Sequence, residues 1–268
     1  SSMIAPPLFE QWESSENKLS IVKNQYSSNQ SISYSWNIST NGSVTYENLV
    51  TSSDGRFTVA ASYGYWNQSS NSHYGGVLSL FYNSNQTPIW NFTGSQWTGV
   101  DISQDGSHIV GSNDDGMLYV WNNNSNIPIW NYSNSDRLYK PSISDDGSLI
   151  AAAKYGELLI YSSTSTNALW TYEFTGDSYP SNIAMSADGE YVVAYYSDEV
   201  YLFEVSSESL LWKYEPDYYL RDTSISADGE YIVFCDGTSN QGGFVYLFDK
   251  DSSTPLWKSV PATSGKRF

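Results

Sequence analysis

The side chains that most often do chemistry are few in this chain and do not form a group along it. Its two histidines are His73, in a polar and aromatic insertion over 63–76, and His108, which directly follows an Asp-Gly turn. Both positions are typical of solvated histidines on a loop or a strand. The single cysteine, Cys235, lies in the apolar run 231–235, which predicts a buried thiol and excludes an intrachain disulfide. We therefore expect no catalytic residue and no enzymatic activity.

Acidic residues next to glycine could instead hold calcium. Asp114-Asp115-Gly116 is the best candidate, but it lacks the alternating oxygen ligands of a calcium loop. No metal site and no cofactor are therefore expected. The regular recurrence of Asp-Gly along the chain indicates a structural role.

The chain is built from a repeat with two markers. The first marker is the tetrad Ser-x-Asp-Gly, which occurs five times, at 52–55, 103–106, 144–147, 186–189 and 226–229. The second is a tryptophan that follows an apolar residue downstream of each tetrad, with one further copy upstream, and it gives the set Trp36, Trp90, Trp130, Trp170, Trp212 and Trp257. From Trp90 onward these tryptophans are about 40 to 45 residues apart, the period of a four-stranded propeller blade.

Each repeat reads as four short strands, as 142–144, 149–153, 158–161 and 168–172 illustrate. The composition agrees, because 16% of the residues are aromatic and Ser, Asn and Gly fill the segments between apolar runs. Asp-Gly after the first strand predicts a type I′ hairpin turn, in which both central residues have positive φ. A large flat side chain at one fixed place in each repeat is expected to pack against the neighbouring sheet.

These patterns predict a single all-β domain over 1–268, a β-propeller of four-stranded antiparallel blades. Six blades are expected, with seven as the alternative, and strands from both chain ends should complete one blade and close the ring. The expected blades are 1–40, 41–95, 96–134, 135–174, 175–216 and 217–260, with 261–268 closing the ring or starting a further blade.

Two parts of the repeat resemble known propeller families. Leu-Tyr-Val-Trp at 118–121 with Pro-Ile-Trp at 128–130, and Val-Tyr-Leu-Phe-Asp at 245–249 with Leu-Trp at 256–257, resemble the quinoprotein (PQQ)-like repeat. Asn122 departs from that pattern, which has an Asp there. The Ser-x-Asp-Gly tetrad resembles the WD40 repeat. The quinoprotein resemblance implies paired cysteines, calcium and a catalytic Asp in a larger ring, whereas this chain has one cysteine and fewer repeats.

Charge restricts the partners. The formal net charge of -17 repels a phosphate backbone, so nucleic acid is not an expected partner. No apolar run approaches the roughly 20 residues of a spanning helix, so no membrane insertion is expected within the chain. A protein or glycan partner is expected, at one mouth of the central channel or on loops joining strands.

Acceptor motifs for Asn-linked glycans occupy only the first half of the chain. They occur at Asn29, Asn37, Asn41, Asn67, Asn85, Asn91, Asn123 and Asn131. Asn37, Asn91 and Asn131 each directly follow a repeat tryptophan, and alternation along a strand sends them to the opposite face. The pattern favours a secreted or cell-surface glycoprotein that acts as a binding, adhesion or structural scaffold. A quinoprotein-like oxidoreductase and an intracellular WD40-like interaction scaffold are the alternatives.

Overall fold

The computed structural model describes residues 18–22, 34–39, 46–62, 64–67, 72–176, 178, 182–237 and 243–259, and every regular element in them is a β-strand. Twenty of the strands form five four-stranded antiparallel sheets, in each of which successive strands are neighbours. This confirms the expected all-β architecture of repeated four-stranded sheets. The number of blades in the ring is not established by these residues.

The five sheets are numbered here in chain order. Sheet 1 contains β3 (Tyr46–Thr51), β4 (Phe57–Ser62), β7 (Val77–Tyr82) and β8 (Pro88–Thr93). Sheet 2 contains β9 (Trp97–Ile102), β10 (His108–Asn113), β11 (Met117–Asn122) and β12 (Trp130–Ser133). Sheet 3 contains β13 (Tyr139–Ile143), β14 (Leu149–Lys154), β15 (Glu157–Ser162) and β16 (Ala168–Glu173). Sheet 4 contains β17 (Asn182–Met185), β18 (Tyr191–Tyr196), β19 (Glu199–Glu204) and β20 (Ser209–Tyr214). Sheet 5 contains β21 (Leu220–Ile225), β22 (Tyr231–Asp236), β23 (Val245–Asp249) and β24 (Trp257–Lys258).

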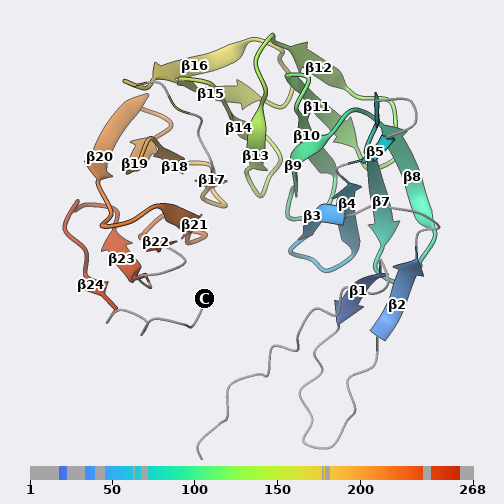
Figure 1. The fold of residues 1–268 in the computed structure, drawn as a ribbon, viewed down its shortest axis with the longest axis horizontal. Helices are drawn as coiled ribbons and strands as arrows, with labels where there is room; N and C mark the ends of the chain where they lie inside the picture. The colour runs from blue at the N-terminus through green and yellow to red at the C-terminus, as the bar shows by residue number, and fades with distance from the viewer. Residues whose placement is uncertain are drawn as a thin grey trace, which may run out of the picture.

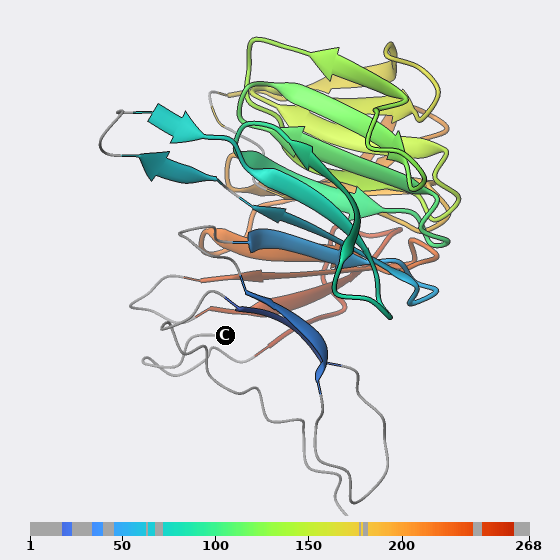
Figure 2. The ribbon, with the colours of Figure 1, turned by 90° about the vertical axis from the view of Figure 1, so that its right-hand side faces the viewer.

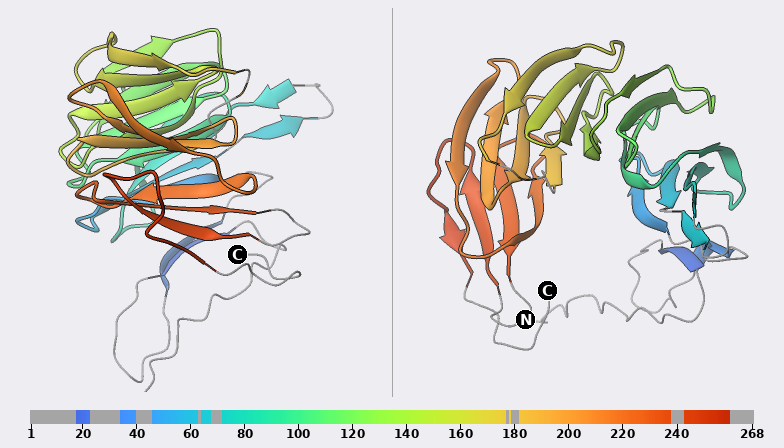
Figure 3. Two further views of the ribbon diagram at one scale, coloured as in Figure 1. Left: turned by 90° about the vertical axis from the view of Figure 1, so that its left-hand side faces the viewer. Right: turned by 45° about the horizontal axis from the view of Figure 1, so that its top comes forward.

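The sheets follow one another around an arc (Figure 1). The first strand of each sheet contacts the first strand of the next, so β3, β9, β13, β17 and β21 line the inside of the arc. The fourth strands lie on its outside. Two further views show the sheets stacked side by side like blades (Figure 3).

Two short strand pairs complete the described residues. β1 (Lys18–Val22) and β2 (Tyr34–Ser39) form an antiparallel pair at the end of the arc beside sheet 1 (Figure 1). β5 (Tyr65–Asn67) and β6 (Ser72–Tyr74) form a hairpin between β4 and β7 that projects beyond the other sheets (Figure 2). The insertion over 63–76 therefore contains this projecting hairpin.

The core lies between the sheets. Each of four apolar clusters joins one sheet to the next, and the cluster between sheets 3 and 4 includes Leu158, Ile160, Val192 and Phe203, all fully buried. A middle strand covered on both faces is buried along its whole length, as in β18, where all six residues are buried. Burial of this apolar surface is the main stabilising term of such a fold.

The expected type I′ turn is wrong. Only the glycine of each tetrad has positive φ, for example +70° at Gly55, whereas the preceding Asp does not. The four residues instead form one β-turn, since the Gly55 N–H donates to the Ser52 carbonyl at 2.8 Å, and Ser52 N bonds to Phe57 O at 3.0 Å to close a four-residue loop. Positive φ at both central residues occurs instead at Ser197 and Asp198, between β18 and β19, without any glycine.

Candidate functional site

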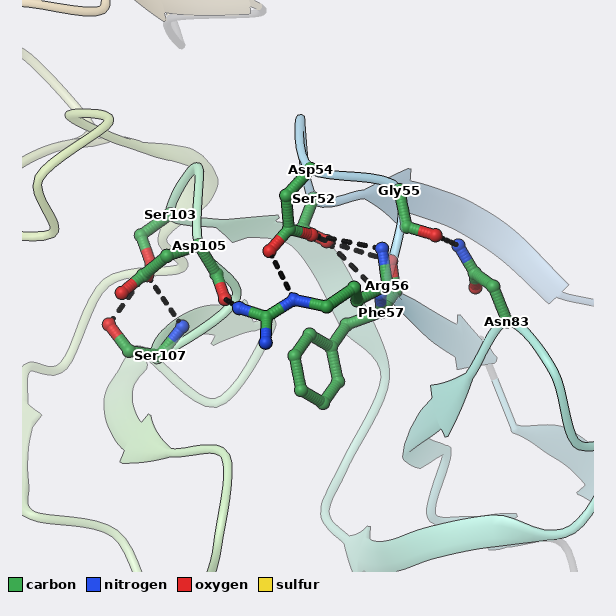
Figure 4. A network of polar contacts seen from close by, with 9 residues as sticks. All are labelled: Ser52, Asp54, Gly55, Arg56, Phe57, Asn83, Ser103, Asp105 and Ser107. Atoms are coloured by element: carbon green, nitrogen blue, oxygen red, sulfur yellow. Dashed lines mark hydrogen bonds and ion pairs between the residues drawn. The ribbon is translucent and has the colours of Figure 1, made fainter.

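Each Ser-x-Asp-Gly turn is held by a closed set of side-chain hydrogen bonds, and Figure 4 shows the first of them. In the first, Ser52 Oγ donates to Asp54 Oδ1 at 2.7 Å and accepts from Phe57 N at 3.1 Å, while Arg56 N donates to the same Asp54 oxygen at 2.9 Å. The bond from Arg56 N is the largest cause that lowers the pKa of Asp54. The carboxylate is therefore engaged in its own turn.

The other four turns repeat these bonds. The distance from the serine Oγ to the aspartate Oδ1 is 2.9, 2.6, 2.5 and 2.6 Å at Asp105, Asp146, Asp188 and Asp228. The serine hydroxyl holds the pKa of Asp146 and of Asp228 below the usual range. The tetrad aspartates thus serve as turn acceptors in every sheet.

Backbone hydrogen bonds connect the turns into a belt that runs from sheet to sheet along one face of the arc. Asp54 N donates to Gln104 O at 3.1 Å, and the series continues with Gln104 N to Asp145 O, Asp145 N to Ala187 O and Ala187 N to Ala227 O, at 2.9, 2.8 and 2.9 Å. Every bond has the same direction, from one sheet to the next. Arg56 adds to the first link, because its Nη2 donates to Asp105 O at 3.1 Å (Figure 4).

A side chain from each sheet also covers the tetrad glycine of the next. A Cβ on Gly106 would lie 2.3 Å from the Phe57 ring, and one on Gly147 would lie 2.6 Å from His108 Nδ1. Leu149 and Tyr191 cover Gly189 and Gly229 in the same way. His108 therefore packs between two turns of adjacent sheets, as a structural residue.

The repeat tryptophans make the corresponding contact at the outer strands. Trp90, Trp130, Trp170 and Trp212 are 8–9% exposed. The indole N–H of three of them donates to a carbonyl just after the third strand of the next sheet, in the pairs Trp90–Asn123 at 2.8 Å, Trp130–Ser163 at 2.5 Å and Trp212–Lys250 at 2.8 Å. Trp257 is 48% exposed, and only the backbone of Trp36 is described, in β2.

A partly buried polar relay crosses three inner strands. Asp101 Oδ2 accepts from Ile143 N at 3.0 Å and from Ser142 Oγ at 3.1 Å, and Ser142 Oγ accepts from Met185 N at 3.2 Å. Loss of hydration raises the pKa of Asp101 to about 6, against the lowering effect of these donors. The relay was not predicted, although Asp101 and Ser142 both precede a tetrad serine by two positions.

The opposite face of the arc carries the β5–β6 hairpin and the connections between sheets. There the buried carboxylate of Asp236 accepts from Phe244 N at 2.7 Å, Tyr218 N at 3.1 Å and the Tyr246 hydroxyl at 2.8 Å. Lys258 lies 3.7 Å from the centre of the Phe244 ring, and Tyr219 is strongly exposed. This face combines aromatic surface with fixed backbone, which suits recognition of a partner.

The glycan acceptor positions fall into two groups. Asn91 and Asn131 are exposed on the outer strands β8 and β12, next to their buried tryptophans, Asn85 is exposed in the turn before β8, and Asn123 is partly exposed. For Asn37 and Asn67 only the backbone is described, in β2 and β5, and Asn29 and Asn41 lie outside the described residues. His73 is likewise described only by its backbone, in β6.

Cys235 is partly exposed rather than buried, because the face of sheet 5 that carries it is not covered by another described sheet. Burial on its other sides still raises the pKa of the thiol. In the described ranges no three His, Cys, Asp or Glu side chains are placed to hold a metal ion. The same residues contain no helix long and apolar enough to cross a membrane.

Comparison with known proteins gives a fold and no family. No family model matches the chain, and no curated protein matches its sequence. Among solved structures, a chain of "Crystal Structure of Mitotic Checkpoint Complex" superimposes with a TM-score of 0.70 at 11% identity, covering 87% of this chain and 72% of that one. The fold is that of a WD40-like β-propeller. The four-stranded sheets are consistent with its blades, while the quinoprotein-like resemblance stays a prediction.

Proposed function

We propose that this chain is an extracellular or cell-surface β-propeller that acts as a non-catalytic binding, adhesion or structural scaffold module. The observation that carries the proposal is the placement of Asn91 and Asn131. Each is exposed on an outer strand beside a tryptophan that is 9% exposed, so a glycan there would extend into solvent without disturbing the contact between sheets.

The propeller is proposed to have six blades, with β1 and β2 as the third and fourth strands of the sixth. The pairing register supports this assignment. Trp36 on β2 lies opposite Ile21 on β1, as Trp90 lies opposite Leu80 and Trp212 opposite Leu202 in complete sheets. The β1 sequence Lys-Leu-Ser-Ile-Val also matches Val-Leu-Ser-Leu-Phe at the start of β7.

The proposed partner is a protein or a glycan that binds the face of the propeller bearing the β5–β6 hairpin. The turns on the opposite face use their polar groups in the belt between sheets, whereas the connections on the hairpin face vary in length and expose Tyr219. The net charge of -17 disfavours nucleic acid on either face.

Glycopeptide mass spectrometry on native material tests the extracellular assignment. We expect glycans at Asn91 and Asn131, and their loss in the variants Asn91→Gln and Asn131→Gln. Asn126, which is exposed near Asn131 but is followed by Ile-Pro, is the internal control and should be unmodified. Unmodified Asn91 and Asn131, in a source that glycosylates other proteins, would favour the intracellular scaffold instead.

A further inference from the structure

One face of sheet 5 is apolar and is not covered by another described sheet. The equivalent face of sheet 4 is buried against sheet 5 and consists of Tyr191, Val193, Tyr195, Val200, Leu202 and Trp212. On sheet 5 the same positions are occupied by Tyr231, Val233, Cys235, Val245, Leu247 and Trp257, all partly or largely exposed. Tyr231 and Trp257 are each 48% exposed, whereas Tyr191 and Trp212 are 9% and 8% exposed. Sheet 5 therefore presents one half of the contact that joins the other sheets.

The other end of the arc presents the complementary half. Gly55 has open space where a Cβ would stand, whereas the four later tetrad glycines are each covered by a side chain of the preceding sheet. The belt of backbone bonds also ends at Ala227 within the described part of the chain. A structural unit between sheets 5 and 1 would have to cover Gly55 and to offer a turn to Tyr231.

β1 has the sequence of an interior strand, since its counterpart β7 is paired on both edges and is largely buried. In the described residues β1 is paired only with β2. No described strand pairs with its second edge, which is the position that the second strand occupies in the complete sheets.

We propose that a β-hairpin with a Ser-x-Asp-Gly turn docks between β1 and sheet 5 and supplies the inner two strands of the sixth blade; this rests on the six-blade part of the proposed function. One strand pairs with β1, and the hairpin face covers Tyr231 and Trp257. In each of the four contacts between successive sheets, a tetrad turn packs against the preceding sheet, so a hairpin with the same turn is the occupant that continues the series. A second copy of the chain fits less well, because each of its five described tetrad hairpins already belongs to a complete sheet.

The test uses the full chain with a synthetic hairpin of sequence 139–154, which contains the first two strands and the turn of sheet 3. We expect saturable one-to-one binding by calorimetry, a blue shift of tryptophan fluorescence and a higher melting temperature. A peptide with Ser144→Ala and Gly147→Val should bind at least about tenfold more weakly, since 1.4 kcal/mol corresponds to tenfold. The same two peptides appended after Phe268 through a flexible linker repeat the comparison at high effective concentration, which removes the demand for tight binding.

Protein variants locate the surface. Trp257→Ala and Tyr231→Ala should each weaken hairpin binding by about tenfold or more, as expected for buried aromatic anchors. Tyr219→Ala, which removes an exposed tyrosine at the other end of β21, should bind as the parent does. Failure of both free and appended hairpins to bind would overturn the proposal, as would binding that Trp257→Ala leaves unchanged or self-association that Trp257→Ala abolishes. The glycopeptide result is independent of all these outcomes, so this proposal and the extracellular assignment can fail separately.

Discussion

Ser142 of sheet 3 donates its hydroxyl to Asp101 of sheet 2 at 3.1 Å, and the same hydroxyl oxygen accepts from Met185 N of sheet 4. One small side chain thus joins three consecutive inner strands. The acceptor Asp101 is largely surrounded by protein, and this burial is the main reason for its raised pKa.

Asp101 makes the stability of the fold depend on pH. Its pKa rises from 3.8 to about 6 on folding, so the ionised form is disfavoured in the folded state. Its contribution is most favourable below about pH 4 and is lost as the pH rises through about 6. Asp101→Asn should reduce the change in unfolding free energy between pH 4 and pH 7 by on the order of 2 kcal/mol, measured by urea denaturation at each pH. An unchanged pH profile would contradict the assignment.

Asp54 should show the opposite dependence. Its pKa is lowered in the folded state, chiefly by the Arg56 backbone N–H, so its stabilising effect is present above the unfolded pKa and is lost as the pH falls. Asp54→Asn is expected to destabilise the protein at pH 7 and to have a smaller effect at acidic pH. Thermal melts at a series of pH values measure the difference, and equal effects at all pH values would exclude an electrostatic origin.

Replacing the tetrad serine should destabilise the protein more than replacing its neighbour. Ser52 is buried and bonds to both Asp54 and Phe57 N, so Ser52→Ala leaves two polar groups without this partner and is expected to cost about 1–3 kcal/mol. Ser53→Ala, at the exposed position beside it, should change stability by less than about 0.5 kcal/mol. Chemical denaturation compares the two, and similar losses would argue against the hydrogen-bonded turn.

Two glycines with the same φ allow the cost of backbone strain to be measured separately from the cost of a side-chain clash. Gly147 and Gly156 both have φ of +72°, but only Gly147 is covered, by His108. Alanine at Gly156 should cost about 1 kcal/mol from φ alone, and alanine at Gly147 about 1–3 kcal/mol more. His108→Ala should relieve part of the Gly147→Ala defect in a double-mutant cycle, and strict additivity would refute the contact.

Trp130 and Trp170 form a matched pair for the hydrogen bond between sheets. Both are 9% exposed, but Trp130 Nε1 donates to Ser163 O, whereas Trp170 Nε1 is buried without an acceptor. Trp130→Phe should therefore be about 1 kcal/mol more destabilising than Trp170→Phe in equilibrium unfolding. A larger loss at Trp170 would show that packing volume, rather than this bond, governs the site.

The repeat made the sheets predictable and left their connections open. Tetrads and tryptophans recur with a fixed spacing because each sheet meets its neighbour in the same way, and strands such as β14 and β15 follow from their apolar runs. The turn type was wrong because Asp-Gly alone does not distinguish a two-residue loop from the last half of a four-residue turn. Asp101 was missed because its partners, Ile143 N and Ser142, lie about 40 residues away and become neighbours only when the sheets are assembled.

Three contacts that recur between successive sheets have one sense: Phe57 covers Gly106, Trp90 donates to Asn123, and Asp54 N donates to Gln104 O. In the language of assembly symmetry these are heterologous, head-to-tail contacts, whose two halves differ and cannot satisfy each other across a twofold axis. Such a series either closes on itself or continues with further units. Closure of the ring therefore has a consequence for assembly: it covers both ends of the arc of sheets, whereas two uncovered ends would let copies add head to tail into a filament.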